Sequence, residues 1–259
     1  MANNQNYLPL FKLLPNAITL LALCCGLTAL KLALHGQFER AVIFIVICGF
    51  LDLLDGRFAR LLNAQSKLGA NLDSLCDFIN FGLVPVLIMY LWSFKNVKVI
   101  GWGVVLIAAV CTCIRLARFN SEEEERGNHP VKNLFFAGIP APAGGILIVA
   151  PILFSFDIFH TPIIFNTKIL IFYTFIISLL MASTIPTIST KKAKIKQEFI
   201  TPAMILIGII FVLTFLYGWL ILLIMCTIYL LLIPYSIIRY KMLLKQYNNN
   251  KDKIDYSSE

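Results

Sequence analysis

The chain has 259 residues, of which 59% are hydrophobic and only 14% are charged, and its mean hydropathy is +0.81. Soluble domains carry about 25% charged residues, so this composition excludes an ordinary water-soluble fold. The net charge of +8 would suggest nucleic-acid binding in a soluble protein, but its distribution along this chain has another explanation, and no nucleic-acid partner is expected.

Apolar stretches long enough to cross a bilayer as helices recur along the chain. A crossing needs about 20 such residues. The pattern predicts an all-α polytopic membrane protein with eight transmembrane helices, near 15–35, 39–56, 75–94, 99–117, 136–156, 162–183, 199–216 and 219–238.

We expect one membrane domain over residues 1–245, followed by a polar, disordered tail over 246–259. Three polar connections are predicted between spans, at 57–72, 119–135 and 184–198. The second contains the acidic block Glu122–Glu125, which we expect to be a solvated loop and to which we assign no role.

The basic residues set the orientation. With the N-terminus in the cytoplasm, 17 of the 22 lysines and arginines fall in cytoplasmic segments and 5 fall outside. Cytoplasmic segments of membrane proteins carry such an excess. The distribution therefore predicts a multi-pass protein of the cytoplasmic membrane whose 57–72 connection faces the cytoplasm.

Four aspartates flank that connection, although the chain has only 14 acidic residues. Asp52 and Asp55 are three residues apart, and Asp73 and Asp77 are four apart, so each pair shares one helix face. Any one of them alone could cap a helix or pair with a neighbouring cation. Four carboxylates converging at a membrane edge would repel one another, and divalent cations remove that repulsion. Because all ligands are hard oxygens, Mg²⁺ or Mn²⁺ is expected, with room for two ions.

The spacing also carries a family resemblance. The stretch Asp52-x2-Asp55-Gly56-x2-Ala59-Arg60-x8-Gly69-x3-Asp73-x3-Asp77 resembles the signature of the CDP-alcohol phosphotransferase family at all eight fixed positions. That family implies a membrane-embedded helical enzyme, which transfers a substituted phosphate from a CDP-linked donor to an alcohol and releases CMP.

The resemblance assigns roles to individual residues. All four aspartates correspond to metal ligands, and Asp77 also to the catalytic base that accepts the proton of the alcohol. The positions that correspond to nucleotide and diphosphate contacts are Asn16, Thr19, Gly56, Ala59, Arg60, Ser66 and Gly69. Asn16 and Thr19 belong to the segment Pro15-Asn16-Ala17-Ile18-Thr19, which is also an ordinary helix start.

Two further segments bear on the acceptor. Arg115-Leu116-Ala117-Arg118-Phe119-Asn120 and the small-residue run 136–144 resemble the phosphatidylserine synthase branch, which implies CDP-diacylglycerol and L-serine as substrates. The arginines could instead anchor the helix at the membrane surface, and the small residues could serve helix packing. A serine carboxylate fits Arg115 or Arg118, with Asn120 as a helper.

Two alternatives remain open from the sequence. The acceptor could be glycerol 3-phosphate, inositol phosphate or choline, with the same chemistry. More remotely, the carboxylates could form the ion path of a cation transporter. The resemblance further implies a homodimer among membrane lipids.

Overall fold

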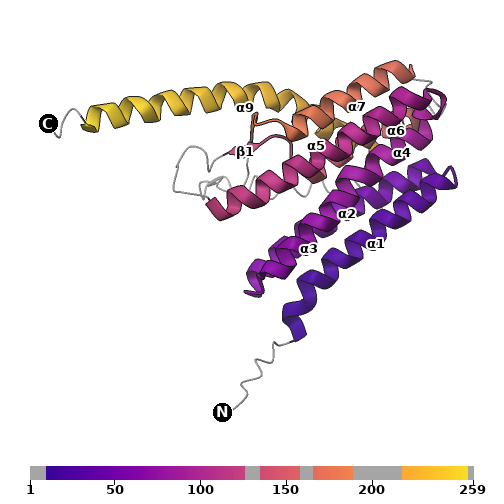
Figure 1. The fold of residues 1–259 in the computed structure, drawn as a ribbon, viewed down its shortest axis with the longest axis horizontal. Coiled ribbons are helices and arrows are strands. Elements are labelled where there is room, and N and C mark those ends of the chain that lie inside the picture. Colours follow the sequence, from indigo (N-terminus) through magenta and orange to yellow (C-terminus); the bar gives the residue numbers. More distant parts are fainter. Residues whose placement is uncertain (1–9, 126–134, 158–165, 189–217, 256–259) are drawn as a thin grey trace, which may run out of the picture.

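The computed structural model describes residues 10–125, 135–157, 166–188 and 218–255, and helices dominate them (Figure 1). The elements are η1 (Leu10–Leu13), α1 (Leu14–Leu34), α2 (Phe38–Leu61), α3 (Lys67–Asp77), η2 (Phe78–Leu83), α4 (Val84–Trp92), η3 (Phe94–Asn96), α5 (Lys98–Glu125), β1 (Phe135–Ala137), α6 (Ala141–Asp157), α7 (Thr167–Ala182), β2 (Pro186–Ile188) and α9 (Gly218–Asp255).

The prediction of an all-α membrane-type fold is confirmed. Within the described residues, four helical stretches are long and apolar enough to cross a membrane: Leu14–Leu34, Lys67–Trp92, Lys98–Ser121 and Leu220–Gln246. The apolar helices Ala141–Ser155 and Thr167–Ala182 are shorter. The span expected at 199–216 lies outside the described residues, so the number eight stays a prediction.

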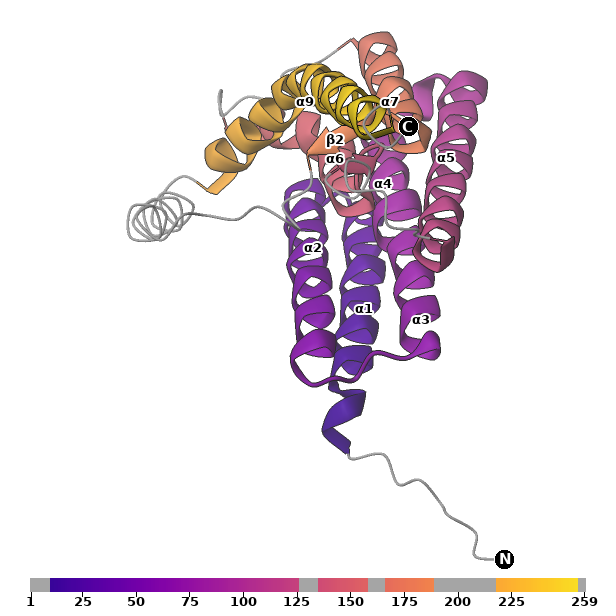
Figure 2. The same ribbon diagram turned by 90° about the vertical axis from the view of Figure 1, so that its left-hand side faces the viewer.

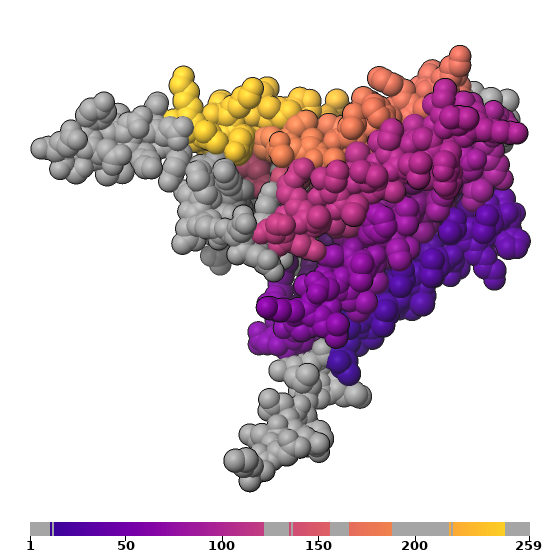
Figure 3. Space-filling view, in the orientation of Figure 1, coloured from indigo at the N-terminus to yellow at the C-terminus, as the bar shows by residue number. Residues whose placement is uncertain are grey.

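Helix α1 lies between α2 and α3. The connection from α2 to α3 crosses the end of α1, as Figure 2 shows, and α1 packs closely on both neighbours. In the space-filling view, α1, α3 and α5 follow one another across one face of the molecule (Figure 3). The arrangement gathers the start of α1, the end of α2 and the start of α3 in one place.

The helices reach further into the polar segments than we predicted. The connection expected at 57–72 is short, because α2 continues to Leu61 and α3 begins at Lys67. Ser66 caps α3 by accepting a hydrogen bond from the Gly69 amide at 3.0 Å, which is the usual chemistry of a helix start.

The same difference occurs at two other places. The loop predicted for Glu122–Glu125 is wrong for the backbone, since α5 is helical through Glu125. Helix α9 continues to Asp255, so no helix ends at the boundary predicted near 245. Hydropathy marks where the apolar stretch ends, whereas a helix can continue through charged residues, and glutamate, as at the end of α5, is a good helix former.

A small antiparallel ribbon was not predicted. Phe136 of β1 lies opposite Thr187 of β2, so the span expected from 136 begins only at Ala141. Gly138 turns the chain after β1 with φ +74°, and a β-carbon there would lie 2.6 Å from the Met181 carbonyl oxygen. Only glycine fits this turn.

The segment η2 is a π-helical turn that directly follows Asp77. Its successive residues meet three different helices: Asn80 packs against Gly26 of α1, Phe81 against Gly145 of α6, and Gly82 against Thr112 of α5. Phe81 is fully buried. The wide turn thus fixes the end of α3, and with it Asp77, against the rest of the bundle.

The close packing of Gly145 on Phe81 leads to a prediction about stability. A β-carbon at Gly145 would lie 3.0 Å from the Phe81 α-carbon, which is backbone and cannot move aside cheaply. We expect Gly145→Val to destabilise the protein by about 1–3 kcal/mol, measured as a lower Tm in detergent. Gly103→Val is the control, because nothing lies within 4 Å of its β-carbon position. Equal Tm values for the two variants would contradict this packing.

Candidate active site

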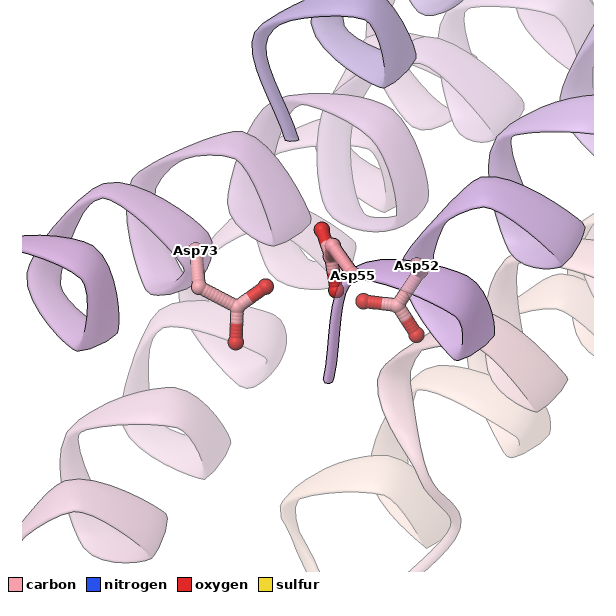
Figure 4. A group of neighbouring side chains, drawn as sticks. All are labelled: Asp52, Asp55 and Asp73. Carbon is pink, nitrogen blue, oxygen red and sulfur yellow. The ribbon is translucent and has the colours of Figure 1, made fainter. Parts of the chain in front are cut away.

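Three of the four aspartates converge. Asp52 and Asp55 project from α2 and Asp73 from α3, and one carboxylate oxygen of each lies within 4.8 Å of the others. Asp55 stands between the other two in Figure 4, and only 5% of its surface is exposed. The structure thus brings together residues 21 positions apart in the chain.

The fourth aspartate lies at the edge of this group. Asp77 is not among the three whose oxygens converge, but its carboxyl group is close enough to interact with that of Asp52. Arg115 of α5 is close enough to interact electrostatically with both. The predicted cluster of four is therefore a triad with Asp77 and Arg115 beside it.

The triad fits a hard divalent cation. Mg²⁺ binds oxygen ligands at about 2.1 Å, so two ligands of one ion lie up to about 4 Å apart, and small side-chain adjustments suffice here. The donor set consists of carboxylate oxygens alone, which favours Mg²⁺ or Mn²⁺ over softer metals.

A hydroxyl group from α1 orients the triad. The side-chain oxygen of Thr19 lies 2.7 Å from Asp55 Oδ2 and 3.1 Å from the Pro15 carbonyl oxygen, and the shorter contact goes to the carboxylate. Thr19 is buried. A second residue that holds a ligand in place in this way supports metal binding.

A cavity of about 620 Å³ adjoins the triad. It is lined by Asp55 and Asp73 and by every residue predicted to contact the nucleotide or its diphosphate, namely Asn16, Thr19, Gly56, Ala59, Arg60, Ser66 and Gly69. The roles of these residues remain predictions, but the fold gathers all of them from three separate elements and the loop between two of them.

The two signature glycines have different surroundings. A β-carbon at Gly69 would lie 2.9 Å from Asn16 Oδ1, so glycine lets α3 approach α1. Nothing lies within 4 Å of a β-carbon placed at Gly56. Packing therefore does not require glycine at position 56. A ligand in the cavity would require it, because a larger side chain would take up the ligand's space.

Sequence reasoning missed part of this lining. The cavity is also bounded by Pro15, Ala64, Gln65, Lys67, Ala70 and Phe119. Lys67 adds a second cation near Arg60, and its position within the connection predicted at 57–72 was the only available signal. Phe119 comes from α5, and nothing in its local sequence places it opposite α1.

The residues predicted to bind the acceptor are tied to backbone or side-chain partners. Arg115 donates Nε to the Ile139 carbonyl oxygen at 2.6 Å, and Arg118 donates Nη1 to that of Ser183 at 3.1 Å. Asn120 Oδ1 accepts a hydrogen bond from the Ser74 hydroxyl at 3.1 Å. Both arginines therefore also hold the ribbon region against α5.

The arrangement suits transfer of a phosphorus group. Anionic oxygens can be neutralised by a triad-bound cation together with Arg60 and Lys67, and Asp77 offers a carboxylate at the edge of the same site. Stabilising charge that builds up on phosphate oxygens is the main task of such sites.

Comparison with known proteins agrees with this chemistry. The model of the CDP-alcohol phosphatidyltransferase family matches residues 12–180. A Helicobacter pylori (strain 26695) protein named CDP-diacylglycerol–serine O-phosphatidyltransferase is 33% identical over 204 residues, which cover 79% of this chain and 83% of that protein.

Two other relatives carry the same name. The Mycobacterium tuberculosis (strain H37Rv) protein is 45% identical over 138 residues, 53% of this chain and 48% of its own length. The Bacillus subtilis protein is 34% identical over 145 residues, 56% of this chain and 75% of its own length. The chain thus spans about half the length of the mycobacterial proteins it matches.

The hydrogen bond from Thr19 generates a prediction. Thr19→Val keeps the shape of the side chain and removes the donor to Asp55, so the affinity for Mn²⁺ should fall about tenfold. Electron paramagnetic resonance of free Mn²⁺ measures this on the purified protein. Thr28→Val is the control, because that hydroxyl donates to the Cys24 carbonyl oxygen of its own helix and not to an aspartate. Unchanged Mn²⁺ affinity in Thr19→Val would show that Thr19 does not support the metal site.

Proposed function

Because the chain belongs to the CDP-alcohol phosphatidyltransferase family, we propose that it transfers the phosphatidyl group of CDP-diacylglycerol to the hydroxyl of L-serine, giving phosphatidylserine and CMP. The observation that carries this proposal is the aspartate triad, two of whose members, Asp55 and Asp73, line a cavity that is also lined by all seven nucleotide-motif residues. The names of the aligned relatives support serine as the acceptor.

We propose that the enzyme is metal-dependent and that Asp52, Asp55 and Asp73 hold Mg²⁺ or Mn²⁺, with Asp77 completing the ligand set for a second ion. When bound, the metal supplies positive charge to the diphosphate oxygens. Thr19 keeps Asp55 oriented for this task.

The donor occupies the cavity in this proposal. Arg60 and Lys67 offset the negative charge of the diphosphate, and the cavity walls from α1 and α2 enclose the nucleotide. Asn16 and Ser66 offer polar groups to it, and Gly56 leaves room for it. The acyl chains of the donor remain in the lipid.

Asp77 acts as the base. It accepts the proton of the serine hydroxyl, whose oxygen forms a bond to the phosphorus that carries the diacylglycerol. The phosphoanhydride bond to CMP breaks, and CMP leaves with the electron pair. A positioned carboxylate is the general means of activating a hydroxyl nucleophile.

Arg115 binds the serine carboxylate. It lies near Asp77 and Asp52, and its Nε is already engaged with Ile139, so a carboxylate would meet the terminal guanidinium nitrogens. Arg118 and Asn120 line the approach from the end of α5.

Location and assembly complete the proposal. The distribution of basic residues supports an enzyme of the cytoplasmic membrane whose active site faces the cytoplasm. The family resemblance supports a homodimer.

The central test is an acceptor panel. Purified protein in lipid nanodiscs receives CDP-diacylglycerol and Mn²⁺ or Mg²⁺, with L-serine, glycerol 3-phosphate, inositol phosphate or choline. We expect CMP release and a new lipid with L-serine alone, and loss of both on chelation of the metal. If CMP were released with another acceptor and not with L-serine, that acceptor would take the place of serine in the proposal. If no acceptor led to CMP release, the cation-transporter alternative would be favoured.

The role of Asp77 has its own prediction. Asp77→Asn removes the proton acceptor but keeps the size of the side chain, so CMP release should fall at least 10²-fold while binding of CDP-diacylglycerol persists. Calorimetric titration with the donor measures binding separately. Substantial activity in this variant would assign the base elsewhere, whereas lost donor binding would indicate a purely structural or metal-binding role.

A further inference from the structure

A wall that carries the hydroxyl groups of Thr187 and Tyr229 lies near Arg115, and the function proposed above gives it no role. It is built from the ribbon β1–β2 and from α9, which packs on β2 and α6. The ribbon is held to α5 by the hydrogen bonds of Arg115 to Ile139 and of Arg118 to Ser183. The wall therefore has a fixed position relative to the site.

Thr187 lies at the centre of this wall. Only 2% of its surface is exposed, and its hydroxyl donates to the Gly138 carbonyl oxygen at 2.7 Å. Because a hydroxyl has one proton, Thr187 can offer a neighbour only its lone pairs.

Tyr229 of α9 reaches this point. Its hydroxyl lies beside the Thr187 hydroxyl and near Arg115. The hydroxyl oxygen is buried, although the side chain as a whole is half-buried. It makes no hydrogen bond of regular geometry within the part of the chain that the structure describes. Buried polar groups are nearly always paired, and one that is not calls for an explanation.

A polar ligand would supply the explanation. The unpaired Tyr229 hydroxyl can turn its proton only toward a lone pair such as those of Thr187, and its own oxygen lone pairs then remain as acceptors. The site then presents a carboxylate base at Asp77, a cation at Arg115 and a neutral acceptor at Tyr229. An acceptor molecule with a hydroxyl, a carboxylate and an ammonium group has one partner for each of them: the hydroxyl for Asp77, the carboxylate for Arg115 and the ammonium group for Tyr229.

We propose that the Tyr229 oxygen accepts a hydrogen bond from the ammonium group of the acceptor substrate, and thereby selects a 2-amino acid. This inference rests on the proposed function. Glycerol 3-phosphate has no ammonium group, and the quaternary nitrogen of choline has no proton to donate, so neither gains from Tyr229.

The experiment compares wild type, Tyr229→Phe and a control, Tyr235→Phe, which removes an exposed hydroxyl from the same helix. We expect Tyr229→Phe to raise KM for L-serine about tenfold, as for loss of a hydrogen bond to a charged group. KM for CDP-diacylglycerol should change less than twofold. Tyr235→Phe should match the wild type, and similar Tm values should show that both variants fold.

A second readout separates ammonium recognition from general shape. 3-Hydroxypropionate is serine without its amino group and should compete with L-serine. Its Ki should be the same for wild type and Tyr229→Phe. An unchanged serine KM in Tyr229→Phe would overturn the proposal, and so would a Ki that rises in parallel with that KM.

The failure of the proposed function would look different. It would appear in the wild type itself, as an absence of CMP release with L-serine. Failure of the present inference leaves wild-type serine turnover intact and changes only what the tyrosine variant shows.

Discussion

The arrangement of the site depends on one constraint, the mutual repulsion among its carboxylates. Asp52, Asp55 and Asp73 place oxygens within 4.8 Å of one another at the end of an apolar bundle, where low polarity magnifies the repulsion. Two groups of the fold reduce this repulsion: the Thr19 hydroxyl donates a hydrogen bond to Asp55, and Arg115 lies near Asp52. A bound cation would complete the compensation. Such a cluster is unfavourable without a ligand, and this favours a site selected for binding over one selected for stability.

Arg115 links the aspartate-bearing helices α2 and α3 to the ribbon region before α6. It stands near aspartates carried by α2 and α3, and its Nε donates to Ile139, just before α6. The hydrogen bond of Arg118 to Ser183 adds a second tie, after α7. In the proposed function, these charged groups therefore serve both chemistry and assembly. A substitution of Arg115 should disturb the position of the ribbon as well as the binding of the acceptor. A conservative substitution of Tyr229 is therefore the better test of acceptor binding.

Much of the site could be predicted from the sequence, because its geometry is local. The spacings of three and four residues fix which aspartates share a helix face, and a short connection must bring the two helix ends together. Helix ends were harder to predict, because hydropathy marks where the membrane ends, whereas helices such as α5 continue through Glu125. The π turn after Asp77 and the ribbon depend on contacts between distant residues, such as Asn80 with Gly26, and no local pattern encodes those.

The division of the chain suggests how a family with one kind of donor can use different acceptors. The family model ends at residue 180 and includes the four motif aspartates and every nucleotide-motif residue. Thr187 and Tyr229 lie beyond it. The shared segment would then hold the metal, the nucleotide and the base, while the later segment supplies the wall that reads the acceptor. Since α9 packs on β2, which lies outside the shared part, and on α6, which lies within it, side chains on that wall could change without disturbing the aspartates. Acceptor choice would then be set separately from phosphatidyl-transfer chemistry, with Arg115 as the residue common to both.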